Sequence, residues 1–292
     1  MKSTSTLSGP GRYADILLDD WFKRSFKEYG NAKRLMLLLL QELIPERKIT
    51  SLTYTPEEST NQNPDRKSIR VDVECTDENG ERFVVEVQRA SQADFYDRAI
   101  FNSTFAIQRQ VKENSLRYGF APVYFIGIMR FSLHPESERY LYRYSLTEDQ
   151  SGSLMTDDLH YVFLEVAKCR PAADAPLIEK VGYALNHMAE FTERPEGFEG
   201  EIFRLLFESA EISTFTPEEK IAYTEDMTTE RDIRNQIAYA RKEGRAEGRA
   251  EGKAEGANQE KLEIARKMVS MKLEASVISE ATGLSEEEIA TL

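Results

Sequence analysis

The order of hydrophobic and polar positions changes its period along the chain, and this change separates expected helices from expected strands. Residues 15–29 carry apolar side chains at helical spacing, and Gly30 ends that pattern. A second helical pattern follows and stops before Pro45. Residues 49–55 are rich in β-branched side chains, so they predict a strand.

The remaining elements follow from the same two periods. A polar loop over residues 56–68 precedes a hairpin over residues 71–88. A helix over residues 94–111 is expected to bury five apolar side chains on one side: Phe95, Ile100, Phe101, Phe105 and Ile107. Further strands are predicted over residues 122–133, 140–146 and 159–166, and further helices over residues 176–191, 200–210 and from Pro217 onward.

Strands are therefore concentrated in the first 170 residues or so, and the rest of the chain is helical in pattern. This distribution predicts an α/β core with a helical C-terminal extension. We divide the chain into a core, a helical extension packed on it, a Gly/Glu/Arg tetrapeptide-repeat helix or linker, and a small helical C-terminal segment, over residues 1–170, 171–240, 241–258 and 259–292.

The hairpin VDVECTDENGERFVVEVQ, residues 71–88, raises a question of register. If its ENG loop has three residues with Gly80 in the left-handed conformation, Asp72 lies directly opposite Glu86 on a polar face. A two-residue NG loop would instead oppose Asp72 to Val87 and mix charged with apolar side chains. The polar alternation therefore favours the three-residue loop.

Two carboxylates opposed across a sheet repel each other unless a positive charge lies between them. A divalent cation is a natural partner, because Mg²⁺ is commonly held by one or two carboxylates, waters and phosphate oxygens. Such an ion lowers the pKa of bound water and offsets charge that develops on a phosphate, as phosphodiester hydrolysis requires. The alternative is that these acids are simply solvated on the outward face of a hairpin.

Composition narrows the class of protein. Of the 292 residues, 51 are acidic and 38 basic, which gives a formal charge of −13 and argues against nonspecific adhesion to nucleic acid. A polyanionic partner then requires a local basic strip or a bound cation. Cys75 and Cys169 predict half-buried thiols in a reducing compartment, so a cytoplasmic location is expected. The longest apolar run, residues 35–40, is far too short for a membrane span.

Several segments in a fixed order resemble one known family. DDWFKRSF precedes the hairpin, and DFYDRAIFNSTFAIQRQV, APVYFIGIMRFSL, FLEV and a Gly-Glu-rich repeat follow it. Together they resemble the PD-(D/E)XK nuclease family transposases, also called the Rpn family of recombination-promoting nucleases. The resemblance implies a restriction-endonuclease-like core, in which helices flank a mixed central sheet. It also implies a Mg²⁺-dependent DNA endonuclease of transposition or recombination, with Mn²⁺ as a possible substitute.

The same resemblance assigns roles within the hairpin. It implies that Asp72 and Glu86 are metal ligands, that the Val87 carbonyl is a further ligand, and that Gln88 occupies the usual lysine position. The amide of Gln88 can orient an attacking water, but it cannot neutralise charge as lysine does. The resemblance therefore implies a catalytic site that depends more strongly on its metal.

Two helices supply the remaining candidates. Asp20, Phe22 and Lys23 match a D-x-F-K pattern, which implies that Asp20 assists the metal site and that Lys23 contacts the substrate. The alternative for Asp20 is an ordinary exposed acid. Glu42 on the next helix is a weaker candidate for the same assisting role.

In the helix after the hairpin, Arg98 and Gln110 match polar family positions, which implies substrate binding, while Asn102 stands where a tyrosine is usual. The alternative for Arg98 is an i,i+4 pair with Asp94 alone. With further basic residues nearby, the helix is expected to offer a strip that faces phosphate: Arg89, Arg109 and Lys112.

Other signals predict less. His134, His160 and His187 lie far apart in sequence, which argues against zinc binding and histidine catalysis. The last 25 residues loosely resemble a helix-turn-helix around Gly283, with a capping box that starts at Ser285. Because the final helix is rich in glutamate, docking of a partner or self-association is favoured over DNA contact.

Three functions remain open at this stage. The first is a DNA endonuclease, for which cutting both strands with one metal centre per chain favours a homodimer. The second is a nuclease fold that is weakly active or inactive and holds DNA or a partner. The third is an interaction protein that acts through its helical tail.

Overall fold

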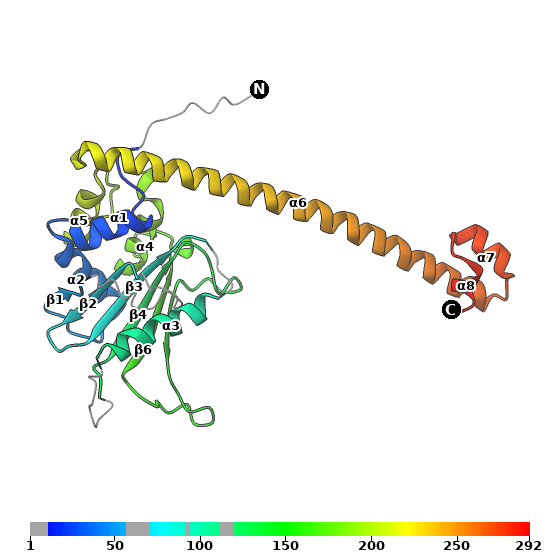
Figure 1. Cartoon of the computed structure of the whole chain (residues 1–292), viewed down its shortest axis with the longest axis horizontal. Helices are drawn as coiled ribbons and strands as arrows, with labels where there is room; N and C mark the ends of the chain where they lie inside the picture. Colours follow the sequence, from blue (N-terminus) through cyan, green and yellow to red (C-terminus); the bar gives the residue numbers. More distant parts are fainter. Residues whose placement is uncertain (1–10, 57–70, 91–93, 111–118) are drawn as a thin grey trace, which may run out of the picture. The chain divides into compact units, whose positions relative to one another are not determined.

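The computed structural model describes residues 11–56, 71–90, 94–110 and 119–292. The chain divides into two compact units, residues 1–223 and 224–292. The first unit is a six-stranded sheet with helices on both faces (Figure 1). The predicted α/β core, a mixed sheet flanked by helices, is therefore confirmed.

The sheet has the strand order β1-β2-β3-β4-β6-β5. Strands β1, β2 and β3 pair antiparallel, β3, β4 and β6 pair parallel, and β5 returns antiparallel at the far edge. Each predicted strand is present, and most are shorter than expected: Leu52–Tyr54 (β1), Val73–Asp77 (β2), Arg82–Gln88 (β3), Val123–Met129 (β4), Leu141–Ser145 (β5) and Leu159–Glu165 (β6).

The β2–β3 hairpin has the predicted register. Val73 pairs with Val85 and Glu74 with Val84, so the ladder continues to Asp72 opposite Glu86. Gly80 has φ of 85°, and its N–H donates to the Asp77 carbonyl at 3.3 Å. The three-residue loop is therefore confirmed, because only glycine adopts this backbone conformation without strain.

Helix α3, Phe95–Gln108, covers one face of the sheet, but with a different side from the one predicted. Ile100 and Phe101 are 53% and 43% exposed. Phe95 is buried as predicted, and Gly127 on β4 makes room for its ring, because a Cβ atom at Gly127 would lie 2.8 Å from it. The rest of the buried face consists of smaller side chains: Ala99, Asn102, Ser103 and Ala106.

The other face of the sheet carries the larger core, formed by helices α1, α2, α4 and α5. The predicted first helix is divided into a short α-helix and a π-helical turn. The helices and short turns of this layer are Asp19–Lys23 (α1), Arg24–Glu28 (η1), Ala32–Leu43 (α2), Val166–Lys168 (η2), Leu177–His187 (α4), Met188–Glu190 (η3), Glu201–Ala210 (α5) and Ile212–Thr214 (η4). Cys75 and Cys169 are fully buried rather than half-buried, and burial raises the pKa of each thiol to about 12.

A buried ion pair fixes the segment that leads into α1. The Asp15 carboxylate accepts two hydrogen bonds of 2.7 Å from the guanidinium of Arg130, which directly follows β4. The Arg130 N–H in turn donates to the Gln88 carbonyl at 2.9 Å. These contacts hold the start of the chain at the carboxyl ends of β3 and β4, and so bring α1 to that edge of the sheet.

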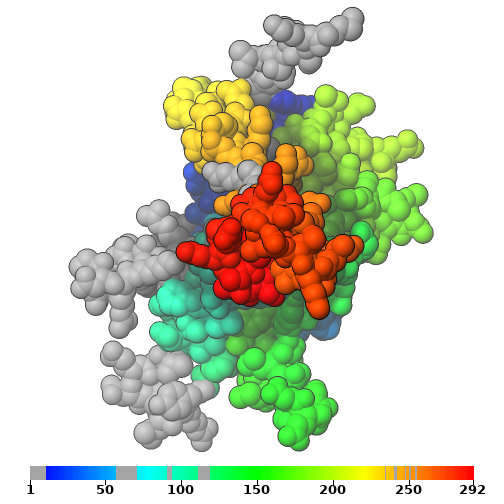
Figure 2. All heavy atoms as spheres, turned by 90° about the vertical axis from the view of Figure 1, so that its right-hand side faces the viewer, coloured from blue at the N-terminus to red at the C-terminus, as the bar shows by residue number. Residues whose placement is uncertain are grey.

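Helix α6, Pro217–Ser270, begins in the first unit and continues without a break through the tetrapeptide repeat. The repeat is therefore helical, one of the two states predicted for it. In the second unit, α7 (Ala275–Thr282) ends before Gly283, and α8 (Glu286–Ile289) begins with the predicted capping box at Ser285. These last residues form one small body, red in Figure 2, around Ala265, Ile278 and Ile289.

Within the ranges that the structure describes, no helix is sufficiently long and apolar to cross a lipid bilayer.

Candidate metal centre on the hairpin

Two buried carboxylates meet where β2 begins and β3 approaches its end. Asp72 directly precedes β2 and is 9% exposed, and Glu86 on β3 is 1% exposed. Glu86 lies on the same face of β3 as Val84, whose side chain belongs to the core beneath α3. The register therefore places Asp72 directly opposite Glu86, as the sequence predicted, and the side-chain period places Glu86 under α3.

Asp72 is held by the backbone of β3. Its Oδ2 accepts a hydrogen bond of 2.8 Å from the Val87 N–H. Since the N–H and C=O of one strand residue face the same edge, the Val87 carbonyl also faces the side on which Asp72 lies. The next carbonyl, that of Gln88, accepts from Arg130 on the opposite edge. The arrangement thus brings one carboxylate and one carbonyl oxygen of the predicted ligand set together.

Glu86 receives hydrogen bonds from three side chains. Gln88 Nε2 donates to Oε1 at 3.0 Å, and Asn102 Nδ2 donates to Oε2 at 2.8 Å. The guanidinium of Arg98 forms an ion pair with Oε1. Arg98 therefore acts at the candidate site itself, beyond the local pair with Asp94 considered above. Asn102 is a site residue that the sequence marked only as a departure from the family pattern.

The charge balance of the pair is unfavourable without a cation. Burial raises the pKa of Asp72 to about 7, and repulsion from Asp19 and Glu86 adds to this, against the Val87 hydrogen bond and Lys23. Burial also raises the pKa of Glu86, although Arg98, Asn102 and Gln88 oppose the rise. A divalent ion would favour the charged form of both carboxylates.

Helix α1 contributes charge to the site through one turn. Asp19 and Lys23, which are i,i+4 on α1, are the helix residues that most affect the pKa of Asp72. Asp20 is exposed and lies about 100° around the helix from Asp19. The D-x-F-K pattern pointed to Asp20, whereas Asp19, which is also exposed, is the α1 acid that raises the pKa of Asp72.

Other predicted residues lie apart from the carboxylate pair. The amide of Gln110 bonds the Ala121 backbone, accepting at 2.8 Å and donating at 3.2 Å, at the end of β4 remote from Glu86. Arg109 forms an ion pair with Glu74. Glu42 lies on α2, where burial raises its pKa. Lys112 lies outside the described residues.

The donor set fits a magnesium ion that keeps several waters. Two carboxylates and a backbone carbonyl are oxygen ligands of the kind that Mg²⁺ prefers. In the described ranges no three histidine, cysteine, aspartate or glutamate side chains gather closely enough to hold a metal alone. Water or substrate oxygens would therefore have to complete the coordination, which is the usual arrangement for Mg²⁺.

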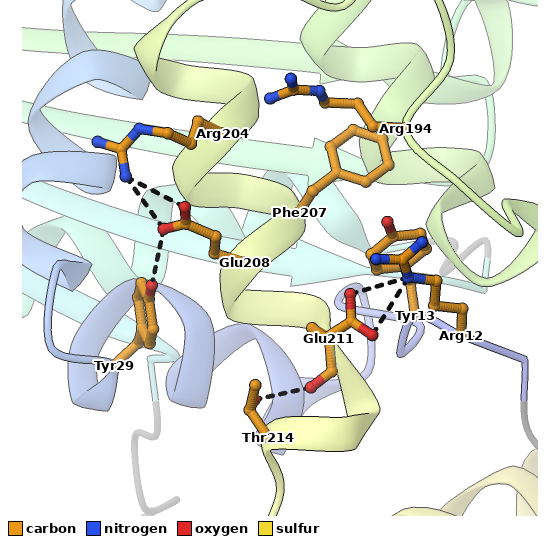
Figure 3. A pocket seen from close by; sticks show the side chains of 9 residues that line it. All are labelled: Arg12, Tyr13, Tyr29, Arg194, Arg204, Phe207, Glu208, Glu211 and Thr214. Atoms are coloured by element: carbon orange, nitrogen blue, oxygen red, sulfur yellow. Dashed lines mark hydrogen bonds and ion pairs between the residues drawn. The ribbon is translucent and has the colours of Figure 1, made fainter.

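A surface pocket of about 560 Å³ lies elsewhere on the first unit. Its arginines are offset by glutamates, since Arg12 pairs with Glu211 at 3.0 Å and Arg204 with Glu208 at 3.1 Å (Figure 3). None of the predicted site residues lines it. The pocket is therefore separate from the candidate metal centre.

Comparison with known proteins gives two matches along the chain. The family model described as PD-(D/E)XK nuclease family transposase matches residues 17–240. The model described as Rpn/YhgA-like nuclease family, C-terminal HTH domain, matches residues 258–292. The resemblance to a helix-turn-helix is thus confirmed, whereas the preference for docking over DNA contact stays a prediction. No curated protein and no solved structure matches the chain significantly.

Proposed function

Since this chain belongs to the PD-(D/E)XK nuclease family transposases, with a restriction-endonuclease-like core and an Rpn-type C-terminal domain, we propose that it is a metal-dependent DNA endonuclease of transposition or recombination. One observation carries the proposal: Asp72 and Glu86 are buried together and their pKa values are raised. Folding two such carboxylates together is costly unless a cation binds between them.

The ligands of the ion, Mg²⁺ or Mn²⁺, would be the carboxylates of Asp72 and Glu86 with the Val87 carbonyl. When bound, the ion supplies a water of lowered pKa and positive charge for the developing phosphorane. Gln88 fixes the orientation of Glu86 and offers an amide to position the water. Gln88 itself carries no charge, and Arg98 supplies a positive charge directly to Glu86.

Arg98 has a double role in this proposal. In the absence of the ion it partly neutralises Glu86. With an ion held by Glu86, the guanidinium of Arg98 would be available to contact a phosphate oxygen, a group that arginine binds in a bidentate way. On α1, we assign the assisting acid to Asp19 in place of or beside Asp20, and a substrate contact to Lys23. The role predicted for Gln110 has no support from its bonds to the Ala121 backbone.

A second function is favoured by the contacts of Glu86. Arg98, Gln88 and Asn102 already satisfy this carboxylate, which is the state expected of a nuclease fold that binds DNA without cutting it. Both functions share DNA as the partner. They differ in whether an ion displaces these contacts.

Supercoiled plasmid incubated with purified protein and Mg²⁺, Mn²⁺ or EDTA separates the two functions. We expect metal-dependent nicking that Asp72→Ala abolishes. The matched control is Asp97→Ala, which removes an exposed acid from α3. Retention of plasmid without nicking, unchanged by EDTA, would replace the enzyme with the binding module. Loss of all partner binding on removal of residues 241–292, with no effect of Asp72→Ala, would favour the interaction protein.

A further inference from the structure

A second polar cluster lies on the same face of the sheet, at the carboxyl end of β6. Its centre is Glu165, which is 0% exposed. Ser132 Oγ, Lys168 Nζ and the Nδ1 atom of His134 each lie 2.7 Å from its carboxylate oxygens. Burial alone would raise the pKa of Glu165, but the hydrogen bonds from Lys168, His134 and Ser132 lower it below the ordinary value. Glu165 is therefore an ionised anchor for the imidazole.

The anchored imidazole presents its other nitrogen to two phenols. The ring of His134 stacks on Tyr142 with centroids 3.8 Å apart, which fixes its plane. Its Nε2 lies 2.8 Å from the Tyr144 hydroxyl and 3.2 Å from the Tyr96 hydroxyl. Tyr96 is 43% exposed, so its hydroxyl reaches the surface. The cluster thus leads from a buried carboxylate to an accessible O–H group.

Of the two phenol hydroxyls near His134, only one can donate its proton to the imidazole. With the Nδ1 proton directed at Glu165, Nε2 has a single lone pair, for which Tyr144 and Tyr96 compete. Tyr144 is the closer, and the 3.4 Å between the two hydroxyl oxygens is too long for a strong O–H···O bond. If both imidazole nitrogens are protonated, both phenol protons are free. In either state Tyr96 has a proton for an external acceptor.

The location of the cluster relates it to the carboxylate pair. Gln88, Met129 and Glu165 are lateral partners across β3, β4 and β6, so all three side chains lie on the α3 face. Two strand spacings, or about 10 Å, separate the backbones of Gln88 and Glu165, so a single DNA strand can pass over both the carboxylate pair and this cluster. Tyr96 also lies in the first turn of α3, where the helix dipole favours anions.

We propose that the hydroxyls of Tyr96 and Tyr144, held by His134, bind an oxygen of a second phosphate on the DNA strand that is cut. This inference rests on the endonuclease function proposed above and extends it to the strand that enters the site. The phenol hydroxyls are neutral donors, so they can bind a phosphate oxygen without forming ion pairs with the acids at the metal centre.

The test uses end-labelled oligonucleotides with one methylphosphonate, a linkage that carries no negative charge. In the wild type, the modified bond itself resists cleavage, and we expect about tenfold weaker cutting at one further bond, at a fixed number of nucleotides from the modified linkage. With Tyr96→Phe, and with Tyr144→Phe, this remote suppression disappears. On unmodified DNA, both variants should cut more weakly than the wild type, because the contact with the second phosphate is lost. The suppression at the modified bond persists and serves as the internal reference.

The matched control is Tyr161→Phe, which removes the hydroxyl that lies 3.1 Å from Ser103 on the same sheet face, outside the cluster. It should keep the remote suppression. Thermal unfolding establishes that each variant is folded. Remote suppression that is absent in the wild type, or that persists in Tyr96→Phe, would overturn the subsite and leave the endonuclease intact. No cleavage of any oligonucleotide by the wild type would overturn the endonuclease, and the subsite with it.

Discussion

Two acidic sites lie side by side on the α3 face of the sheet, and they are balanced differently. Glu74 is buried and pairs with Arg82 at 3.1 Å and with Arg109. Two residue pairs further along the same hairpin, Asp72 opposes Glu86, and Arg98 forms an ion pair with Glu86. At the first site two arginines pair with one carboxylate. At the second, Arg98 pairs with Glu86 and Lys23 favours the charged form of Asp72, while Asp19 adds to the negative charge, so acids outnumber these cations. Arg98 lies on α3, and Arg109 directly follows that helix.

The difference separates an acid that stabilises the fold from acids that await a ligand. A buried ion pair contributes to a unique structure only if each charge is matched. Glu165, like Glu74, is buried beside a basic side chain. Lys168 and the hydrogen bonds from His134 and Ser132 lower the pKa of Glu165. At Asp72 and Glu86 the pKa values rise instead. Burial is thus common to all four acids, and the local excess of negative charge singles out the candidate metal centre.

The two sites should differ most in their effect on the rate of DNA cleavage. Glu86→Gln keeps the volume of the side chain and removes its charge, and we expect metal-dependent nicking to fall by about 10³-fold, as for loss of a charged group at a transition state. Glu74→Gln should keep its activity per folded molecule. Single-turnover rates on a defined duplex measure both. Equal losses in the two variants would mean that the two sites are not functionally different.

The pH dependence of stability without metal gives the next largest effect. The pKa of Asp72 is about 7 in the folded chain and 3.8 in a model compound. Because the folded state keeps the proton of Asp72 to a higher pH than the unfolded state does, the free energy of unfolding falls as pH rises from about 4 to about 7. The loss from this carboxylate amounts to about 4 kcal/mol, at 1.36 kcal/mol per pKa unit.

The measurement is urea denaturation of wild type and Asp72→Asn in EDTA across that range. The two curves should coincide near pH 4 and diverge until about pH 7, with the variant the more stable. Millimolar Mn²⁺ should raise the stability of the wild type alone at pH 8. A wild type that is as stable as Asp72→Asn at pH 8 in EDTA would show that the pair is not strained.

At Glu74 we expect the opposite effect, because removing the charge of this carboxylate should destabilise the protein. Glu74→Gln leaves Arg82 and Arg109 without their buried partner, so the free energy of unfolding should fall by about 3 kcal/mol. The same urea series measures it at pH 7. The matched control is Asp97→Asn on the exposed side of α3, for which a change within about 0.5 kcal/mol is expected. If Glu74→Gln stabilised the protein, Glu74 would belong with the metal ligands.

The smallest effect concerns Gln88. Gln88→Lys places a cation beside Glu86, where it lowers the pKa of that carboxylate and partly replaces Arg98. We expect a rise of about fivefold in the nicking rate at subsaturating Mg²⁺, or about 1 kcal/mol. Gln88→Met, which can neither orient water nor carry charge, should slow it. A slower Gln88→Lys would indicate that the amide has a role that a cation disrupts.

Local patterns were sufficient for the hairpin and for the strand positions. The ENG loop and the alternation around Asp72 and Glu86 fix the register, because a slip of one residue would turn every apolar side chain to the wrong face. The helix over residues 94–111 was correctly located, and Phe95 is buried as expected, yet Ile100 and Phe101 lie outside. The buried face is instead completed by Ala99, Asn102, Ser103 and Ala106, beside the Phe95 ring that fills the space above Gly127.

The sequence by itself determined which carboxylates face each other, because a turn and a two-residue period act over a few positions. Which cations and amides reach those carboxylates was decided only by tertiary structure. Arg98 and Asn102 come to Glu86 through the packing of α3 on β4, and Asp19 comes to Asp72 through the Asp15–Arg130 pair. His134 and Glu165 are 31 positions apart in the sequence, and the fold brings the Nδ1 atom of His134 to the carboxylate of Glu165. Such contacts depend on how close two elements approach, a distance that no local pattern encodes.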